Sequence, residues 1–313
     1  MIRIATRGSA LALWQANWVR DRLMADDPHL AVELLVLKTR GDKILDRALS
    51  EVGGKGLFVK EIEEALLDGR AEVAVHSMKD LPAEIPVGLM LGAVPEREDA
   101  RDALLVAPKV PARDVASLPH GARVGTSSLR RVCQLKARRP DLDVVPLRGN
   151  VDTRVRKVDA GELDAIVLAC AGLKRLGHGA RITAALSTAE SLPAIGQGAL
   201  AIECRVDDPE TLRRLARLDH RVTAHAVAAE RAFLARLQGD CKTPLAAHAT
   251  VDGARLSMEG LVGAPDGSKL LRHKLEGTTE DAADVGNALA EELLKMGADR
   301  LLTFTTTEVV GGE

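Results

Sequence analysis

Short apolar runs alternate with segments of helical periodicity through the first two thirds of the chain. The apolar runs have the length of buried strands; they occupy residues 2–5, 32–37, 73–75, 124–125, 143–147 and 165–169. The segments between them repeat apolar residues every three to four positions, as one face of a helix does; they occupy residues 11–23 after an N-cap at Ser9, 57–67, 129–139 and 153–160. This alternation predicts an α/β fold with doubly wound sheets.

Two breaks divide this pattern into domains. A charge-dense segment at 95–99 precedes the second α/β unit, and the Pro- and Gly-containing segment 193–198 predicts a hinge. The β-like run 199–204 has no room for a further α/β unit, so we expect it to return to the first sheet. Beyond residue 218, a long helix ending near Gln238-Gly239, three β-like runs between 245 and 275 and a helix over 280–295 predict a small α+β domain. The predicted domains are residues 1–97 with 197–216, 98–196, and 217–313.

Composition removes several classes of function. The 313 residues are 46% hydrophobic and 28% charged, which fits two or three domains that bury their own cores. Lys and Arg number 43 against 45 Asp and Glu, so the net charge is −2, and only 2% of residues are aromatic. A nucleic-acid partner is therefore not expected, because neither bulk positive charge nor base-stacking surface is present.

Signals for export and membrane insertion are also missing from the sequence. No apolar run reaches the roughly 18 residues of a membrane span, and the first residues lack the apolar core and cleavage site of a signal peptide. The four cysteines are too sparse for a disulfide scaffold and form no C-x-x-C pair. We therefore expect a cytoplasmic protein without a membrane partner. We also expect a monomer, because the sequence shows no strong apolar stripe beyond those of the predicted cores.

The segment 76–82 (HSMKDLP) is the first candidate site. It follows the predicted strand 73–75 directly, and ligands in open α/β sheets bind beyond the carboxyl ends of strands. Asp80, beside Lys79, is a candidate acid–base group; the alternative is an aspartate that only shapes the turn before Pro82.

Arginines follow several predicted strand ends. Arg130 and Arg131 lie in the first turn of a helix that the hydroxyl residues Thr126, Ser127 and Ser128 are predicted to cap. Cations at this position oppose the helix dipole. A bound carboxylate or phosphate would explain the pair, and a solvated surface pair is the alternative. Further arginines with forked donors suited to carboxylates flank other strand ends; these are Arg7, Arg148, Arg154 and Arg175.

Two glycine-rich motifs do not fit nucleotide binding. Gly53-Gly54-Lys55-Gly56 lacks the Ser or Thr of a phosphate loop, so we interpret residues 42–56 as a mobile lid or an ordinary flexible loop. Gly196-Gln197-Gly198 precedes a β-like run where a dinucleotide fingerprint requires a helix. The eight histidines show no metal-ligand spacing, so no metal is expected.

Cys241 lies in the polar turn Gly239-Asp240-Cys241-Lys242-Thr243-Pro244. A free cysteine is most often a small buried hydrophobe, but this one occupies a turn between a helix and a strand. An accessible thiol in a reducing compartment indicates a chemical role.

Taken in order, these segments resemble the porphobilinogen deaminase (hydroxymethylbilane synthase) family from end to end. The matching motifs are RIATRGSALALWQ at 3–15, VGGKGLFVK at 52–60, HSMKD at 76–80, GTSSLRR at 125–131, LRGN at 147–150, AGLKRL at 171–176, IGQG at 195–198 and the Cys241 turn. The resemblance implies two domains like those of type II periplasmic binding proteins, and a third, small domain that presents a cysteine loop at their cleft.

The resemblance also implies a transferase activity. The implied enzyme would condense four porphobilinogen molecules head to tail with loss of ammonia, and would then release linear hydroxymethylbilane by hydrolysis. A dipyrromethane cofactor stays attached through a thioether, for which Cys241 matches the attachment position. Asp80 matches the catalytic acid. The implied cofactor contacts are Lys79, Asp80, Thr126, Ser127, Ser128, Arg130, Arg131, Arg148 and Gly149. The implied substrate contacts are Arg7, Ser9, Gln15, Lys55, Arg148, Arg154, Arg175 and Gln197.

Asp240 departs from the family pattern, which generally has glycine before the cysteine. Its negative charge disfavours a thiolate at Cys241, so we expect slower cofactor loading than with glycine at position 240. Glu51, just before the glycines of the 53–56 motif, adds an acidic residue near a polyanionic ligand, and we have no physical explanation for it. Two other functions remain to be weighed. A carboxylate sensor or transport component would need an export signal and would not use Cys241. A sulfur or phosphate transferase would also use an exposed cysteine beside arginines.

Overall fold

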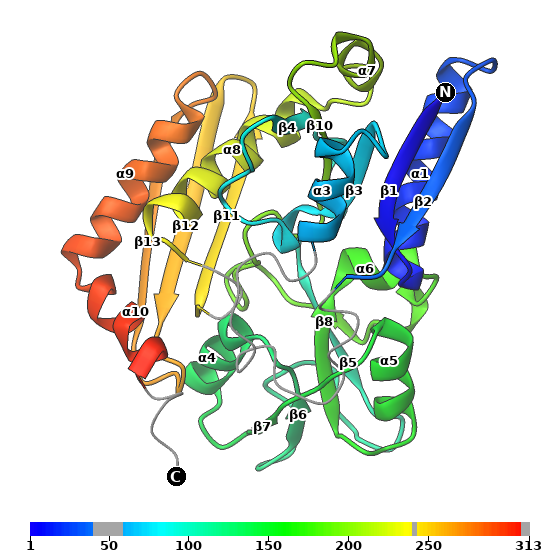
Figure 1. The fold of residues 1–313 in the computed structure, drawn as a ribbon. Coiled ribbons are helices and arrows are strands. Elements are labelled where there is room, and N and C mark those ends of the chain that lie inside the picture. Colours follow the sequence, from blue (N-terminus) through cyan, green and yellow to red (C-terminus); the bar gives the residue numbers. More distant parts are fainter. Residues whose placement is uncertain (40–58, 240–242, 308–313) are drawn as a thin grey trace.

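Three β-sheets organise the chain. The computed structural model describes residues 1–39, 59–239 and 243–307. Figure 1 shows the first sheet at the upper right, the second below it and the third at the left. Each sheet takes its strands from one of the three predicted segments. The α/β fold class with a small C-terminal α+β unit is therefore confirmed, while the predicted domain boundaries stay a prediction.

The first sheet has the strand order β2-β1-β3-β10-β4. Its strands are β1 (Ile2–Arg7), β2 (Val32–Leu37), β3 (Val73–Ser77), β4 (Leu89–Ala93) and β10 (Leu200–Arg205). β1 pairs in parallel with β2 and β3, whereas β10 runs antiparallel between β3 and β4. The run after the predicted hinge does return to the first sheet, as expected.

Helices cover both faces of this sheet because side chains alternate along its strands. Ile4 and Val75 pack under α1 (Ala10–Asp26), while the neighbouring positions, Ala5 and Ala74, pack under α3 (Lys60–Leu67). Ser9 caps α1 as predicted, since its side chain accepts a hydrogen bond from the backbone N–H of Ala12. The short helix α7 (Pro209–Leu215) follows β10.

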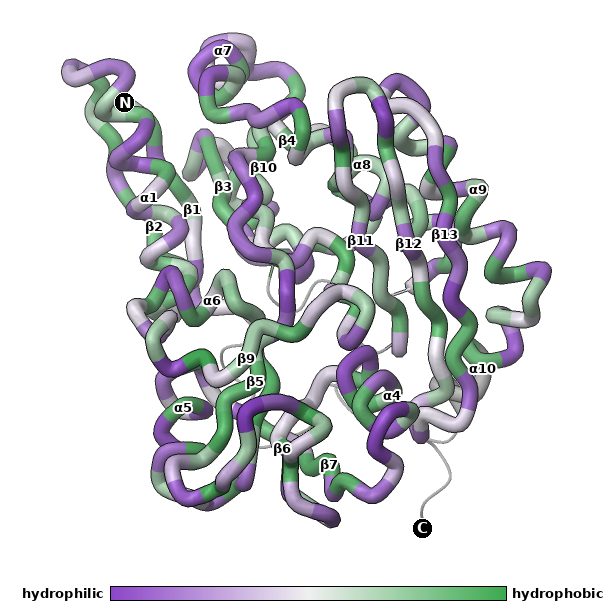
Figure 2. Tube along the Cα trace, turned by 180° about the vertical axis from the view of Figure 1, so that it is seen from behind, coloured by the Kyte–Doolittle hydropathy of each residue, from purple (hydrophilic) through white to green (hydrophobic). Residues whose placement is uncertain are grey.

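The second sheet has the order β7-β6-β8-β5-β9. Its strands are β5 (Asp102–Val106), β6 (Arg123–Gly125), β7 (Asp143–Val145), β8 (Ala165–Ala169) and β9 (Ala184–Ala185). Its helices are α4 (Leu129–Arg138), α5 (Val151–Asp159) and α6 (Cys170–Arg175), with a 3-10 turn, η2, at Gly179–Arg181. Figure 2 shows hydrophobic residues concentrated in the central strands of both larger sheets and hydrophilic residues on many surrounding turns.

The third sheet is antiparallel and lies between two layers of helix. It consists of β11 (Leu245–Asp252), β12 (Arg255–Gly263) and β13 (Leu270–Thr278). One face packs on α8 (Arg221–Arg236), α9 (Ala282–Lys295) and α10 (Ala298–Thr307). The other face, through Ala246 and Leu261, contacts Cys133 of α4. The third unit is therefore joined to the second through a shared apolar core.

Two crossings connect the first and second sheets. The backbone N–H of Glu98 donates to the carbonyl of Gly198 over 3.2 Å, so the crossings run side by side. Gly198 has a φ of 89°, and a Cβ there would lie 2.3 Å from the carbonyl oxygen of Glu98, so only glycine fits. Glu230 of α8 binds both crossings: it accepts from the Arg97 guanidinium at 2.6 and 3.1 Å and from the Gly196 N–H at 2.6 Å.

Candidate active site

A cleft lies where the first sheet meets the second. Its larger pocket contains about 520 Å³ of space, part of it open solvent, and a neighbouring pocket contains about 400 Å³. Leu11 and Ser77 line both pockets. The larger one is bordered by Lys79 from the first unit and by Arg131, Arg154 and Arg175 from the second. Side chains that are distant in sequence thus face a common space.

The end of β3 delivers the predicted HSMKD motif to this cleft. β3 continues to Ser77, and a 3-10 turn, η1 (Met78–Asp80), follows. Met78 is buried, and its N–H donates to the carbonyl of Ala199 over 3.0 Å, which anchors the turn. Lys79 is half-buried and Asp80 is exposed. Asp80 is the single acidic side chain among the described residues that line the two pockets.

Burial perturbs the cations around the cleft. It lowers the pKa of Lys79 to about 8; Asp80 opposes this shift, and Arg131 and Arg130 add to it. It also lowers the pKa of Arg154 to about 10, where Arg131 adds to the effect and Asp80 opposes it. Burial lowers the pKa of Arg175 to about 10 as well. These shifts indicate partly desolvated positive charge, which a carboxylate from a ligand would stabilise.

Three of these cations have no carboxylate partner within the described part of the chain. Arg154 donates from Nε to the carbonyl of Gly149 over 2.7 Å. Arg175 donates to the carbonyl of Gly198 over 2.7 Å, and its guanidinium carbon lies 5.6 Å from the centre of the Trp14 ring. The ammonium group of Lys79 makes no hydrogen bond or ion pair with residues 1–39, 59–239 or 243–307. The cleft therefore presents positive charge that the described protein does not neutralise.

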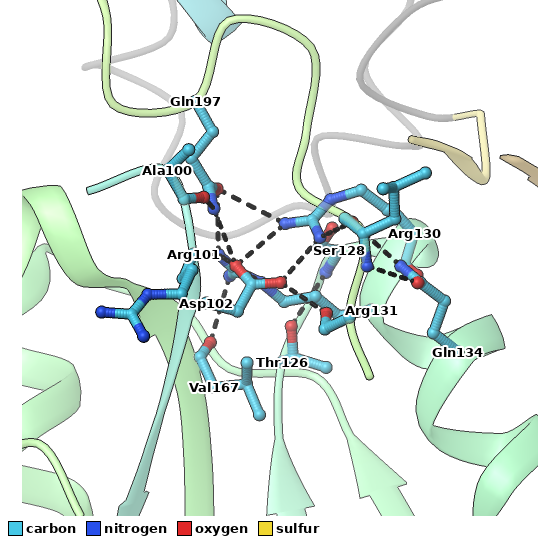
Figure 3. Close-up of polar contacts among 12 residues, drawn as sticks. Ala100, Arg101, Asp102, Thr126, Ser128, Arg130, Arg131, Gln134, Val167 and Gln197 are labelled. Atoms are coloured by element: carbon cyan, nitrogen blue, oxygen red, sulfur yellow. Dashed lines mark hydrogen bonds and ion pairs between the residues drawn. The ribbon is translucent and has the colours of Figure 1, made fainter. Parts of the chain in front are cut away.

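Arg130 and Arg131 differ from this group because their carboxylate lies inside the protein. Figure 3 shows both guanidinium groups around Asp102, with ion-pair distances of 2.7 Å each. All three side chains are buried. The alternative of a solvated surface pair was wrong, and the anion that accounts for the pair need not be a ligand. Burial raises the pKa of Asp102, but the two arginines lower it by more, to well below its usual range.

The side chain of Gln197 completes this buried network. Its amide donates to the carbonyl of Ala100 over 2.6 Å and to Asp102 over 3.0 Å, and its oxygen accepts from both arginines at 3.4 Å. Arg130 also donates to the carbonyl of Leu192, whereas Arg131 borders the cleft. Gln197 and Arg130 belong to this network and are not among the residues that line the two pockets. Their direct contact with a ligand stays a prediction.

The hydroxyl residues before α4 shape a loop and do not cap the helix. Ser128 occupies the N-cap position, but its side chain makes no capping hydrogen bond. Thr126 accepts from the Ser128 N–H over 3.2 Å, and Ser127 exchanges two hydrogen bonds with the backbone of Leu147. The prediction of hydroxyl caps was therefore wrong in detail. These contacts tie the start of α4 to the segment that carries Arg148.

The loop before α5 places Arg148, Gly149 and Arg154 together. Gly149 has a φ of 109°, and a Cβ there would lie 2.8 Å from Cγ2 of Thr153, so glycine is required. Its carbonyl is the acceptor for Arg154. Arg148 is half-buried and close enough for its charge to lower the pKa of Arg154.

The smaller pocket gathers the remaining candidates of the N-terminal motif. Arg7, Ser9 and Gln15 all line it, together with Asp80. Gln15 is buried and donates to Oγ of Ser77 over 2.8 Å, which holds β3 against α1. The structure thus brings these residues of the N-terminal motif to the same pocket as Asp80.

Several predicted residues lie outside the described residues: Lys55 with the 42–56 segment, Glu51, Asp240 and Cys241. Among the described residues, no three His, Cys, Asp or Glu side chains gather as a metal site would require. Within the same residues, no helix has the length and apolar content to cross a membrane.

Sequence reasoning missed Asp102 and the role of Trp14. Asp102 begins an otherwise apolar strand, DALLV, and an acidic residue at the head of a buried run was the available signal. Trp14 lies within the predicted helix 11–23, where its apolar periodicity indicated no further role, but its ring also contacts the Arg175 guanidinium.

Comparisons with known proteins agree with the sequence motifs. Residues 2–213 match the family model described as "Porphobilinogen deaminase, dipyromethane cofactor binding domain", and residues 224–295 match "Porphobilinogen deaminase, C-terminal domain". A curated relative from Syntrophotalea carbinolica, named "Porphobilinogen deaminase", is 58% identical over 301 residues, which cover 96% of this chain and 95% of the relative.

Solved structures with a similar backbone include solute-binding proteins. The periplasmic aliphatic sulphonate binding protein SsuA of Escherichia coli is 14% identical with a TM-score of 0.41, covering 76% of this chain and 70% of SsuA. The second substrate-binding domain of a putative amino acid ABC transporter from Streptococcus pneumoniae is 13% identical with a TM-score of 0.43, covering 69% of this chain and 90% of that domain.

Proposed function

The chain belongs to the porphobilinogen deaminase family, and from this premise we propose which of its residues carry out the reaction. Its activity is that of hydroxymethylbilane synthase, a transferase of tetrapyrrole biosynthesis that works with a dipyrromethane cofactor. This activity sets aside the carboxylate sensor and the sulfur or phosphate transferase.

The unneutralised cations of the cleft support this assignment of residues most directly. Each pyrrole of porphobilinogen carries an acetate and a propionate, and forked or point-like cations recognise such groups. Lys79, Arg154 and Arg175 border one pocket without a carboxylate partner among the described residues. Arg131 joins them, held in place by Asp102. We assign these four side chains to the carboxylates of the growing pyrrole chain.

The same donors fit the cofactor. Two linked pyrroles bring four carboxylates, and the partly desolvated cations around the 520 Å³ pocket can neutralise such groups. When bound, dipyrromethane supplies the pyrrole terminus to which substrate is joined. We propose Cys241 as its attachment point, with Thr126, Ser127, Ser128, Arg130, Arg148 and Gly149 forming or supporting the surrounding wall. Lys55, Arg7, Ser9, Gln15 and Gln197 are proposed to act on the substrate side, Gln197 through the Asp102 network.

Asp80 is proposed as the catalytic residue because it is the acidic side chain of a basic cleft. Its carboxylate can accept a hydrogen bond from a pyrrole N–H and stabilise the positive charge that develops when ammonia leaves. The anchored turn Met78–Asp80 limits its movement. Positioning on the end of β3 therefore gives the group a defined orientation toward the substrate.

The test combines intact mass with turnover. We expect purified protein to carry two pyrrole units on Cys241 and to consume porphobilinogen. Asp80→Asn should keep that mass and lose at least about a hundredfold in kcat, within the range that general acid–base groups contribute. Asp68→Asn, an exposed aspartate at the end of α3, is the matched control. Near-normal turnover of Asp80→Asn, or a bare polypeptide mass in active protein, would refute the assignment.

Two coarser features complete the proposal. We propose that the protein acts in the cytoplasm, because its four cysteines are too sparse for a disulfide scaffold and fit a reducing compartment. We propose that its substrate is porphobilinogen and that it acts as a monomer. Size-exclusion chromatography with light scattering would test the oligomeric state.

A further inference from the structure

Both tryptophans of the chain lie on α1, and both meet an arginine. Trp18 contacts Arg22, four residues further along the same helix, with 5.2 Å between the guanidinium carbon and the ring centre. The guanidinium carbon of Arg175 lies 5.6 Å from the ring centre of Trp14, but Arg175 is the last residue of α6 in the second unit. The Trp14–Arg175 contact therefore joins the two larger units, whereas the contact of Trp18 stays within one helix.

Core packing does not account for a tryptophan at position 14. Trp18 packs against the apolar core between α1 and the first sheet. Trp14 belongs to none of the apolar clusters that the described residues form. Its side chain is half-buried, and a cation lies against its ring. The contact with Arg175 is therefore the feature that sets Trp14 apart from the other residues of α1.

The contact lies at the edge of the larger pocket. α1 and α6 touch at the junction of the first and second sheets (Figure 1). A Cβ on Gly172 of α6 would lie 3.7 Å from Cδ2 of Leu11, one turn before Trp14. Leu11, Gly172 and Arg175 line the larger pocket, whereas Trp14 lines neither pocket. Trp14 thus supports a pocket cation without taking up space in the pocket.

The other contacts of Arg175 leave most of its hydrogen-bonding capacity unused. A guanidinium has five N–H donors, and within the described part of the chain Arg175 has one acceptor, the carbonyl of Gly198 at 2.7 Å. The charge of Glu98 attracts Arg175, but the Glu98 carboxylate pairs with Lys174 at 3.1 Å. Arg175 therefore borders the pocket with N–H donors that a ligand carboxylate can occupy.

An aromatic ring is suited to hold a cation in this state. The face of the ring attracts a guanidinium that stacks on it, and the in-plane N–H donors stay available. Arg131 is held differently, because the carboxylate of Asp102 accepts from its Nε and Nη2 and offsets its charge. Trp14 can therefore orient a guanidinium without neutralising it.

We propose that Trp14 is a positioning residue of the reaction: its ring holds the guanidinium of Arg175 at the pocket, so that the remaining donors meet a pyrrole carboxylate in a defined direction. The inference rests on the proposed assignment of Arg175 to the carboxylates of the pyrrole chain. Trp14 itself touches neither substrate nor cofactor. Because its ring comes from α1, the orientation of Arg175 also depends on the packing of α1 against α6.

The first test measures steady-state kinetics of matched variants. Trp14→Leu keeps apolar bulk but removes the ring, and KM for porphobilinogen should rise about tenfold, the size of a partly desolvated cation–aromatic contact. kcat should change by less than about twofold, because the lost contact serves binding and not the chemical step. Trp14→Phe, which restores an aromatic face, should return KM to within about threefold of the unmodified enzyme. Trp18→Leu on the same helix is the control and should leave KM unchanged.

A double-mutant cycle separates this role from a purely structural one. If Trp14 acts through Arg175, Trp14→Leu should raise KM in the unmodified enzyme and leave KM unchanged in an Arg175→Gln background. Additive effects of the two substitutions, or an unchanged KM in folded Trp14→Leu, would overturn the inference. Failure of the proposed function would look different, because Arg175→Gln alone would then leave KM unchanged.

A spectroscopic readout depends neither on turnover nor on substitution of Trp14. In holoenzyme carrying Trp18→Phe, Trp14 is the single tryptophan of a chain without tyrosine, and indole emission responds to a positive charge beside the ring. Arg175→Gln should shift the emission maximum of this protein. Lys174→Gln, at the exposed preceding position, is the control and should not shift it. Equal emission maxima with and without Arg175→Gln would show that the contact does not form, and would overturn the inference.

Discussion

Removing the charge of Asp102 should reveal how strongly the buried network holds the second unit. Asp102→Asn keeps the shape of the side chain but deletes the anion between two guanidinium groups. Asp102 accepts from Arg130 at 2.7 and 3.1 Å, from Arg131 at 2.7 and 3.0 Å, and from Ser191 at 2.7 Å. The variant therefore leaves two buried cations without a counter-charge.

The magnitude follows from that burial. Breaking a buried ion pair by removing one partner lowers the free energy of unfolding by about 3–5 kcal/mol, because an uncompensated charge remains in the interior. Asp159→Asn is the matched control: its partner Arg181 lies 2.6 Å away, but the Asp159 side chain is 42% exposed. An exposed pair of this kind contributes about 0–1 kcal/mol.

The dependence on pH supplies an independent check. The pKa of Asp102 is lowered in the folded protein by its two arginines. Its stabilisation is therefore fully present above the unfolded value, about 3.9, and is lost as the pH falls toward the lower folded value. The difference between the two proteins should stay constant from pH 7 to pH 5 and shrink only in stronger acid.

Urea unfolding followed by circular dichroism at several pH values measures this difference. A loss below about 1 kcal/mol at pH 7, equal to that of Asp159→Asn, would refute the reasoning. Porphobilinogen turnover of the surviving folded fraction adds a functional measure, because Arg131 borders the cleft and depends on Asp102 for its orientation. KM should rise more than kcat falls.

Two further predictions concern the cleft itself. Arg154→Gln should lower kcat/KM for porphobilinogen by about 10- to 100-fold, the equivalent of a lost charged hydrogen bond, whereas Arg156→Gln on the exposed side of α5 should change it little; equal effects would contradict the assignment. Because burial lowers the pKa of Lys79 to about 8, kcat/KM should fall as the pH rises through that value and the ammonium loses its proton. Lys79→Arg, which stays charged, should move this decline to higher pH, and an unmoved profile would assign it to another group.

Local patterns predicted the regular elements that are long and apolar. The runs 32–37 and 165–169 are strands with those bounds, and the helix after Ser9 begins where its cap indicates. β9 has only two residues, too short to carry a pattern. α10 contains a Thr-rich end with low helix propensity, which concealed it.

The candidate site could be predicted where its residues directly follow the carboxyl end of a strand. HSMKD and the arginines after the second-unit strands follow carboxyl ends, which meet at one edge of a sheet. Asp102 and the His76–Glu203 pair could not be inferred in the same way. His76 and Glu203 come together because β10 returns to the first sheet and pairs with β3. Asp102 reaches Arg130 and Arg131 only through the strand order of the second sheet.

The carboxylate of Glu230 has a mechanical consequence. It binds Arg97 in one crossing, Gly196 in the other and the N–H of Ala249 in the third sheet. The three contacts fasten both crossings and the third sheet to one side chain of α8. A change in the angle between the two larger sheets would therefore have to preserve or break these contacts.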